Sequence, residues 1–375
     1  MKKAFVLTLV IILAVFSVFS LSSCDEDSLP QEFKDFMGGF SGFFEGLFDD
    51  SASSGGGSAA DGLEYELVDG CYAVTGYTGD SSDVVIPESY RGLPVTSIKS
   101  KAFYDSAITS VIIPSSVVSI GHGAFEECGL LESITLPFVG ASANGERNTH
   151  FGFIFGASEY KNNWLVPSKL KSVILTGGSF IDEYSFYNCS HIEDITIPAT
   201  IKEIKDYAFS ECDSLEKVFI FDVAAWCNIS FGDNPLRIAE NLYMVGSDTP
   251  VTSLIIPEGV TAISSEAFYN ASCLKTVSIP NGVTEIGTDA FMGCSSLESI
   301  NIPSTVSTIG VRAFYECKSI KSIMIPSSVT VVGASAFSGC TSLTINCVAK
   351  AKPLSWDNGW NYSNRPVNWG VAVDK

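Results

Sequence analysis

The stretch that decides the fold reads PNGVTEIGTDAFMGCSSLESINI (280–302), PSTVSTIGVRAFYECKSIKSIMI (303–325) and PSSVTVVGASAFSGCTSLTI (326–345). A related copy, PEGVTAISSEAFYNASCLKTVSI, begins at Pro257. Each copy follows the pattern P-x-x-V-x-x-[IV]-x-x-x-A-F. It then ends in a segment in which apolar and polar residues alternate. A fixed period of this length is typical of stacked coils, each too small to bury its own apolar side. The stretch therefore predicts a solenoid.

The apolar spacing changes within each unit. The end of a unit, with Leu297, Ile300 and Ile302, is spaced as in a short strand. The middle, with Val283, Ile286 and Ala290, steps by three and four, which is typical of a helical or 3₁₀ turn. We therefore expect an α/β repeat solenoid, a curved stack with short parallel strands on its concave face.

The same unit can be followed through most of the chain. The position of the leading proline recurs at Pro114, Pro137, Leu175, Pro198, Phe221, Pro257, Pro280, Pro303 and Pro326. The two longer intervals are interpreted as loops on individual coils, and the second is expected to hold a hairpin in NLYMVGSDTPVTSLII. The expected organisation is an N-terminal cap (63–92), a solenoid of about ten coils (93–346) with insertions near 138–164 and 222–250, and a Trp- and Pro-rich C-terminal cap (347–375).

The N-terminal segment has the pattern of an exported lipoprotein. Two lysines precede an apolar stretch (4–19), which predicts a signal peptide over 1–23. The residues LSSC (21–24) resemble the bacterial lipobox, and this resemblance implies that Cys24 is lipidated. Residues 24–62 would form a lipidated flexible tether. Phe residues at helical spacing over 33–48 could lie on the membrane, but four glycines favour a loosely ordered tether.

The repeat positions predict a core. The positions one and three residues before each proline are expected to face inward. An aromatic spine is predicted from Phe103, Phe125, Phe186, Phe209, Phe268, Phe291, Phe314 and Phe337. Cys128, Cys189, Cys212, Cys294, Cys317 and Cys340 each follow a spine Phe by three residues. One cysteine per coil at the same position predicts a column of free, buried thiols rather than disulfides.

No pattern in the sequence points to catalysis. The chain has only three histidines, and no metalloprotease, phosphate-loop or nucleophile-elbow motif occurs. His122 and His191 occupy variable turn positions, so His150 in the first insertion is the one histidine that could mark a site. We therefore expect no enzyme, no cofactor and no metal site. The formal charge of −20 also argues against a nucleic-acid partner.

The position two residues before each proline points away from the core and lies on the predicted concave face. Five of its nine members are apolar, and a neighbouring row is rich in small polar residues. This pattern favours a protein-binding surface, although β-propensity alone would also select Ile, Val, Thr and Phe. The candidate ligand-binding residues are Ile112, Thr135, Val173, Thr196, Phe219, Ile255, Ser278, Asn301 and Met324.

The unit V-T-E-I-G-x-x-A-F-x-x-C-x-S-L-x-x-I-x-I-P resembles the BspA-like leucine-rich repeats of bacterial surface proteins, over roughly 63–375. This resemblance implies a cell-surface, lipid-anchored protein, exposed at the surface or in the periplasm, that adheres to extracellular matrix, plasma or bacterial surface proteins. It carries over no catalytic residues. Two alternatives stay open: a glycan-binding module that uses the insertions and Trp226, and a non-catalytic envelope scaffold. The C-terminal Trp cluster would either hold a sugar or seal the last coil.

Overall fold

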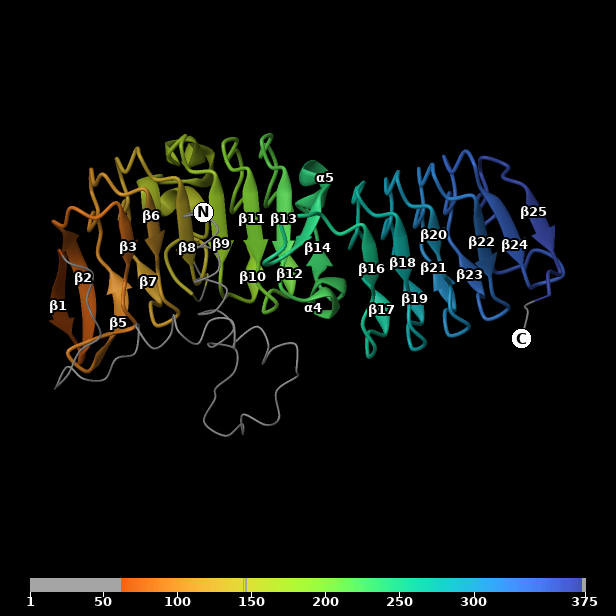
Figure 1. Cartoon of the computed structure of the whole chain (residues 1–375), viewed down its shortest axis with the longest axis horizontal. Coiled ribbons are helices and arrows are strands. Elements are labelled where there is room, and N and C mark those ends of the chain that lie inside the picture. Colours follow the sequence, from red (N-terminus) through yellow and green to blue (C-terminus); the bar gives the residue numbers. More distant parts are fainter. Residues whose placement is uncertain (1–61, 144, 146, 373–375) are drawn as a thin grey trace.

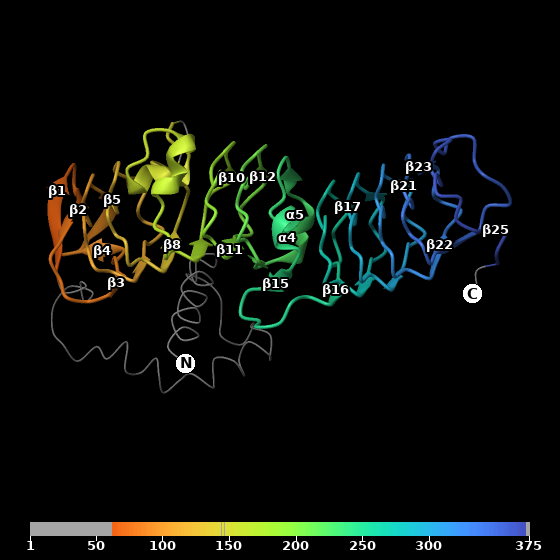
Figure 2. The same cartoon turned by 90° about the horizontal axis from the view of Figure 1, so that it is seen from above.

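The computed structural model describes residues 62–372, apart from 144 and 146, as one elongated stack of coils (Figures 1 and 2). The predicted signal peptide and nearly all of the predicted tether lie outside the described residues. Within the described ranges, no helix is both long enough and apolar enough to cross a membrane. Each coil contributes a strand to one or both of two sides of the stack, which Figure 2 shows as separate rows.

One side, called here the long-strand side, carries strands of two to four residues that run parallel to one another. They are β3 (Asp83–Val85), β6 (Ser110–Ile112), β8 (Ser133–Leu136), β9 (Ser172–Leu175), β11 (Asp194–Ile197), β13 (Lys217–Ile220), β15 (Leu242–Met244), β16 (Ser253–Ile255), β18 (Thr276–Ser278), β20 (Ser299–Ile300), β22 (Ser322–Ile325), β24 (Thr344–Cys347) and β25 (Val367–Trp369). The first seven form one sheet, which ends at β15, and two three-stranded sheets follow. The parallel strands agree with the predicted solenoid.

The opposite side, called the short-strand side, carries two-residue strands: β7 (Ser119–Ile120), β10 (Phe180–Ile181), β12 (Glu203–Ile204), β14 (Ser230–Phe231), β17 (Ala262–Ile263), β19 (Glu285–Ile286), β21 (Thr308–Ile309) and β23 (Val331–Val332). At the N-terminal end, β1 (Leu63–Val68) pairs antiparallel with β2 (Cys71–Tyr77), and β2 pairs with β5 (Leu93–Ile98), which also contacts β4 (Ser89–Tyr90) and β7. The middle of each unit forms a two-residue strand and then turns closed by i→i+3 hydrogen bonds, such as Met292 N to Asp289 O. The predicted turn is therefore present, but it does not extend into a helix.

A left-handed residue explains why the turn is not helical. The residue before each Ala-Phe pair has a positive φ, for example 65° at Glu266, 57° at Asp289 and 51° at Arg312. A residue in this conformation cannot continue a right-handed helix. The chain therefore reverses at this point and directs the following phenylalanine into the core.

The predicted core positions are confirmed. The residues one and three positions before each proline are buried, including Ile113, Val111, Ile302 and Ile300. All eight predicted spine phenylalanines are at most 2% exposed. Neighbouring rings stack in nearly parallel planes where coils follow one another directly. Phe291 and Phe314 have ring centroids 5.6 Å apart and planes 1° apart.

The predicted thiol column is also confirmed for the described cysteines, which are all free. Five of its six members donate a hydrogen bond to the carbonyl of a spine phenylalanine in the preceding coil, as in Cys317 Sγ to Phe291 O at 3.1 Å. Burial raises the pKa of the Cys212 thiol to about 12, which keeps it protonated. The thiol thus adds a second hydrogen bond to a buried carbonyl that already accepts from the backbone, as Phe291 O does from Cys294 N.

The first insertion is part of the stack rather than a loop. It contains two 3₁₀ helices, η2 (Phe151–Phe155) and η3 (Tyr160–Leu165). Phe125 N donates to Ile154 O, and Phe151 N donates to Ser185 O, so the insertion continues the backbone ladder on both sides. The Phe151 ring lies 5.0 Å from that of Phe186. The interpretation of this segment as a loop on an individual coil was therefore wrong.

The second insertion supplies a further coil. It contains α4 (Val223–Cys227), β14, α5 (Leu236–Ala239) and β15. The predicted hairpin does not form, because β15 pairs in parallel with β13, and β16 pairs in parallel with β18. Phe219 lies beside Tyr243 in this ladder, 24 residues along the chain. The 24-residue interval between Phe219 and Tyr243 is close to the 23-residue repeat period, so this segment adds another strand to the stack.

Candidate functional site

The candidate site is the outward-facing row of the long-strand side. Strand pairing places Val85, Ile112, Thr135, Ile174, Thr196, Phe219 and Tyr243 in one row across the seven-stranded sheet. Beyond the break at β15, the two following sheets present Ile255, Ser278, Asn301, Met324, Asn346 and Asn368. We call these thirteen residues the outward row.

One predicted member of this row was placed wrongly. Val173 pairs with Ile134 and is 0% exposed, so it lies in the core. Ile174 pairs with Thr135 and takes the outward position. The error is a slip of one residue in the coil that lacks its proline, and such a slip moves every side chain of a strand to the other face.

The two halves of the outward row differ in chemistry. The N-terminal half is apolar or carries threonine, and the Phe219 and Tyr243 rings lie 5.0 Å apart. The C-terminal half is mainly Ser and Asn, interrupted by Ile255 and Met324. Exposure ranges from 5% at Thr135 and Thr196 to 71% at Ile255. Ile255 is therefore the most exposed large apolar side chain that the sequence assigned to this site.

Asn301 serves the backbone rather than a ligand. Its side chain accepts a hydrogen bond from Ile279 N and donates one to Ile279 O, each at 2.8 Å. The Asn301 side-chain amide therefore makes the two hydrogen bonds that a strand backbone would make to Ile279, just beyond the end of β20. Farther along, Asn368 Nδ2 donates to Asn346 Oδ1, and Asn346 Nδ2 donates to Ser322 Oγ. Side-chain ladders thus join neighbouring coils over the C-terminal half.

A charged pair borders the apolar half. Lys217 Nζ lies 3.2 Å from Asp194 Oδ1, on neighbouring strands β13 and β11. Burial raises the pKa of Asp194, and attraction to Lys217 only partly opposes this. An apolar row beside a charged rim is the arrangement that protein interfaces commonly have.

Sequence reasoning missed several members of the row. Tyr243 was hidden because its segment was interpreted as a hairpin. The spacing of 24 residues from Phe219 and the alternation in Leu242–Met244 were the signals that could have revealed it. Val85, Asn346 and Asn368 were missed because they were assigned to the caps or their borders.

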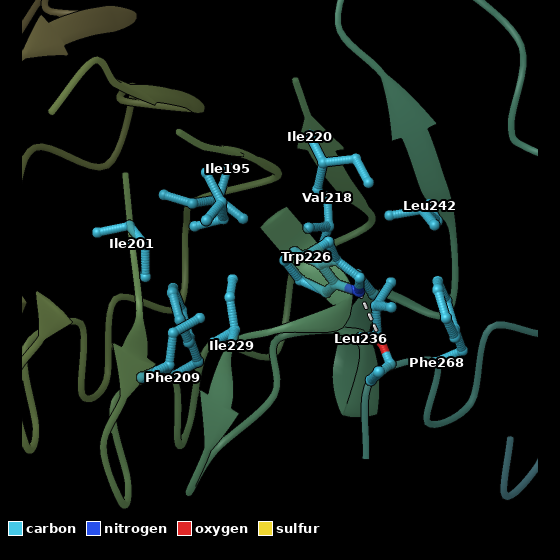
Figure 3. Packing of buried hydrophobic residues seen from close by; sticks show 14 of the residues in the cluster. Ile195, Ile201, Phe209, Val218, Ile220, Trp226, Ile229, Leu236, Leu242 and Phe268 are labelled. Carbon is cyan, nitrogen blue, oxygen red and sulfur yellow. Dashed lines mark hydrogen bonds between the residues drawn. The ribbon is translucent and has the colours of Figure 1, made fainter. Parts of the chain in front are cut away.

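Trp226, proposed for glycan binding, belongs to the core instead. It is 1% exposed and packs among Ile195, Val218 and Leu236 (Figure 3). Its Nε1 donates to Ala267 O at 2.6 Å. In regular coils this carbonyl position receives the backbone N–H of a spine phenylalanine. The indole therefore replaces a missing ladder bond and cannot stack on a sugar.

The C-terminal tryptophans pack on the last spine ring. Trp360 meets Phe337 edge to face, with ring centroids 6.1 Å apart, and contacts Trp356 at 4.8 Å. Both tryptophans are at most 5% exposed. Trp356 Nε1 donates to Val329 O at 3.1 Å. Buried rings of this kind offer no open face to a sugar.

An array of tyrosines follows the turns near the first insertion. The ring of Tyr184 lies between those of Tyr160, at 4.3 Å, and Tyr207, at 5.1 Å. Tyr187 meets the first two edge to face, and its hydroxyl donates to Glu211 Oε1 at 2.8 Å. Because Tyr184 has a neighbouring ring stacked on either side, we interpret the array as a link between coils.

His150 is a structural residue of the first insertion. It is 6% exposed, its Nε2 lies 3.2 Å from Ala157 O, and its ring meets Phe153 edge to face. Burial lowers the pKa of His150, and nearby His122 lowers it further, whereas the contact with Ala157 O and the charge of Glu159 oppose the shift. In the described part of the chain, no group of three His, Cys, Asp or Glu could hold a metal ion.

Acidification should therefore loosen the first insertion. Above about pH 6.5 the imidazole is neutral in both folded and unfolded chains. Below that pH the unfolded chain binds the proton first, so stability falls until the pH reaches the lowered folded pKa. Amide hydrogen exchange over η2, corrected for intrinsic rates, should speed up between about pH 7 and pH 5. His150→Gln should remove this dependence, and His191→Gln should keep it; unchanged dependence in His150→Gln would refute the assignment.

Comparison with known proteins gives a family match. The model of the BspA type Leucine rich repeat region matches six copies, over 82–143, 158–234 and 237–355, which is more than half of the chain. No curated protein matches the chain.

Solved structures are similar along most of their length. A leucine-rich repeat protein from Bacteroides ovatus is 25% identical, over 83% of this chain and 91% of that one, with a TM-score of 0.32. A leucine rich cell surface protein from Faecalibacterium prausnitzii is 21% identical, over 87% and 100%, with a TM-score of 0.31. The pneumococcal vaccine antigen PcpA is 15% identical, over 85% and 100%, with a TM-score of 0.31.

Proposed function

Because the chain belongs to the family of BspA-type leucine-rich-repeat proteins, we propose that it is a lipid-anchored cell-surface protein that binds another protein through the outward row. The observation that carries the proposal is the set of accessible apolar side chains Ile112, Phe219 and Tyr243, which lie on the outer face of the sheet beside a charged rim. The members of the row between Ile112 and Phe219 are at most 7% exposed. A family of repeat proteins with an extended surface of this kind suits binding and not catalysis.

The binding partner we propose is a protein of the extracellular matrix, of plasma or of a neighbouring bacterial surface. The aromatic pair Phe219 and Tyr243 offers a rigid apolar anchor, and Ile255 lies on the first strand beyond the sheet break. Interfaces gain most of their affinity from a few such anchors, whereas the small polar residues around them exclude water. Residues Ser278 and Met324 would extend the contact over the C-terminal half.

Charged substitutions should abolish this binding without unfolding the chain. The triple variant Phe219→Asp, Ile255→Asp, Met324→Asp is expected to raise Kd by at least about 100-fold, because hot-spot residues contribute about 2 kcal/mol or more each. The matched control is Val118→Asp with Val331→Asp, which changes exposed valines outside the outward row, 53% and 41% exposed. Surface plasmon resonance gives Kd, and thermal melting checks the fold. A folded triple variant that binds like the wild type would refute the proposal.

The membrane anchor has its own test. Cys24 lies outside the described residues, and its proposed lipidation rests on the lipobox-like LSSC (21–24). Two or three acyl chains would hold the protein firmly, since each buried CH₂ contributes about 0.8 kcal/mol. Whole cells grown with radioactive palmitate should label the wild-type protein, and Cys24→Ala should abolish the label. Cys71→Ala serves as the control, and a label retained by Cys24→Ala would contradict the anchor.

A further inference from the structure

The tyrosine array near the first insertion ends in an open ring. Tyr207 stacks on Tyr184 through one face, with ring centroids 5.1 Å apart and planes 6° apart, yet it is 52% exposed. Strand β14 pairs in parallel with β12, in the register that puts Ser230 beside Glu203. Counted on from this pair, Asn234 holds the place of Tyr207 in the next coil, but it is fully buried and has no ring. The outer face of the Tyr207 ring is therefore accessible.

Two carboxylates border this end of the array. Asp206 precedes Tyr207 and is exposed, and Glu183, which is also exposed, precedes the neighbouring ring. Desolvation raises the pKa of Tyr184, and the negative charges of Glu183 and Asp206 raise it further, so both carboxylates lie near the array. In the described part of the chain, neither of them forms an ion pair with a lysine or an arginine. An open aromatic face thus lies beside negative charge that has no counter-charge.

The chain itself shows which group fits a surface of this kind. The Arg237 guanidinium lies 4.5 Å from the centroid of the Tyr269 ring, and its Nη2 lies 2.6 Å from Glu266 Oε1. One planar cation therefore stacks on a tyrosine and pairs with a carboxylate at the same time. A guanidinium group suits this arrangement better than an ammonium group does, because it is planar and more weakly hydrated.

We propose that the outer face of Tyr207, together with Asp206 and Glu183, binds an arginine side chain of a protein partner. The guanidinium would stack on the ring as the next member of the array and would donate hydrogen bonds to the Asp206 carboxylate. Charge complementarity selects this occupant, because an uncharged ring would leave both carboxylates without a counter-charge. The formal charge of −20 also disfavours an anionic partner.

The test uses the purified chain and three acetylated and amidated hexapeptides, with the sequences GGRRGG, GGKKGG and GGEEGG. Backbone amide shifts in two-dimensional NMR report binding residue by residue. The arginine peptide should shift the amide signals of Asp206 and Tyr207 in a saturable way, with a Kd of about 1–10 mM, as expected for a few exposed contacts. The lysine peptide should bind at least about threefold more weakly, and the glutamate peptide should not bind.

Three variants change the proposed surface. Tyr207 has a φ of 59°, which asparagine adopts readily, so Tyr207→Asn should fold and should weaken binding of the arginine peptide at least about fivefold. Tyr207→Leu keeps a large apolar side chain, and it should weaken the binding by a similar factor because it lacks the aromatic face. Asp206→Asn should weaken the binding at least about threefold and reduce its dependence on salt.

Two matched controls should bind the arginine peptide as the wild type does. Tyr104→Asn removes a tyrosine that is 50% exposed but whose ring centroid already lies 5.0 Å from Lys101 Nζ. Asp248→Asn removes an exposed carboxylate in the loop that follows β15, away from the array. Thermal melting should show all variants folded.

Four outcomes would overturn the proposal: no binding of the arginine peptide, equal binding of the arginine and lysine peptides, amide shifts that avoid Tyr207, or wild-type binding by folded Tyr207→Asn. The triple variant of the outward row should keep its binding of the arginine peptide. This result would separate the tyrosine surface from the protein-binding surface proposed above, because none of its residues belongs to the outward row.

Discussion

Replacing Phe314 by alanine should lower the free energy of unfolding by about 3–5 kcal/mol. The ring is fully buried and stacks between Phe291 and Phe337, with centroids 5.6 Å from each. Its removal deletes two stacking contacts and leaves a cavity that neighbouring coils cannot close, because their backbones are fixed by hydrogen bonds. The substitution keeps the carbonyl that accepts from Cys340 Sγ, so the loss reports on the ring itself.

Urea unfolding followed by circular dichroism measures this loss. Tyr362→Ala removes an aromatic ring that is 77% exposed, and it should change the free energy by less than about 0.5 kcal/mol. A loss below about 1 kcal/mol for Phe314→Ala would mean that the spine does not carry the stability we assign to it.

Replacing Trp226 by alanine should cost about 3–5 kcal/mol and should also divide the unfolding into two steps. The indole fills the core where the second insertion joins the C-terminal coils, and it donates to Ala267 O across that junction. Asn234 Nδ2 donates to the same carbonyl at 3.4 Å, so the alanine variant keeps only a weak partner there. Coils in a repeat protein contact only their neighbours, so a weak junction lets the two halves unfold separately.

Trp226→Phe separates the two roles of the indole. It keeps an aromatic ring but loses the N–H donor, so we expect a smaller loss, of about 1–3 kcal/mol, with a single transition. Urea curves recorded by circular dichroism distinguish one transition from two. One transition with an unchanged slope in Trp226→Ala would contradict the view that this residue couples the halves.

The period of the sequence predicted the interior well because burial repeats with it. A position that is apolar in every coil must face the core, and this argument correctly located the spine phenylalanines, the thiol column and the alternating strand residues. It worked best from Pro257 to Cys340, where each unit begins with proline and keeps one register.

The predicted strand register was wrong where the sequence lacks the proline that begins the other units. Thr176 takes the place of the proline after β9, and the strand reads Ser-Val-Ile-Leu. Three apolar residues in succession cannot show which one faces outward, so Val173 and Ile174 were exchanged. Trp226 was misjudged for a related reason: its coil has no Ala-Phe pair, and nothing in the sequence shows that an indole takes over that place.

The sequence predicted which face of the sheet holds the candidate site, but not which residues of that face bind a partner. Alternation within strands indicates which residues point outward, but an outward Ile or Phe is favoured by strand propensity whether or not a partner binds it.

The most direct test of the central claim is a binding measurement with the purified wild-type chain on purified matrix proteins, plasma proteins and glycans presented side by side. The account predicts saturable binding to at least one protein, which soluble glycans do not compete and which the triple variant of the outward row loses. Binding to glycans alone, or protein binding that the folded triple variant retains, would contradict it.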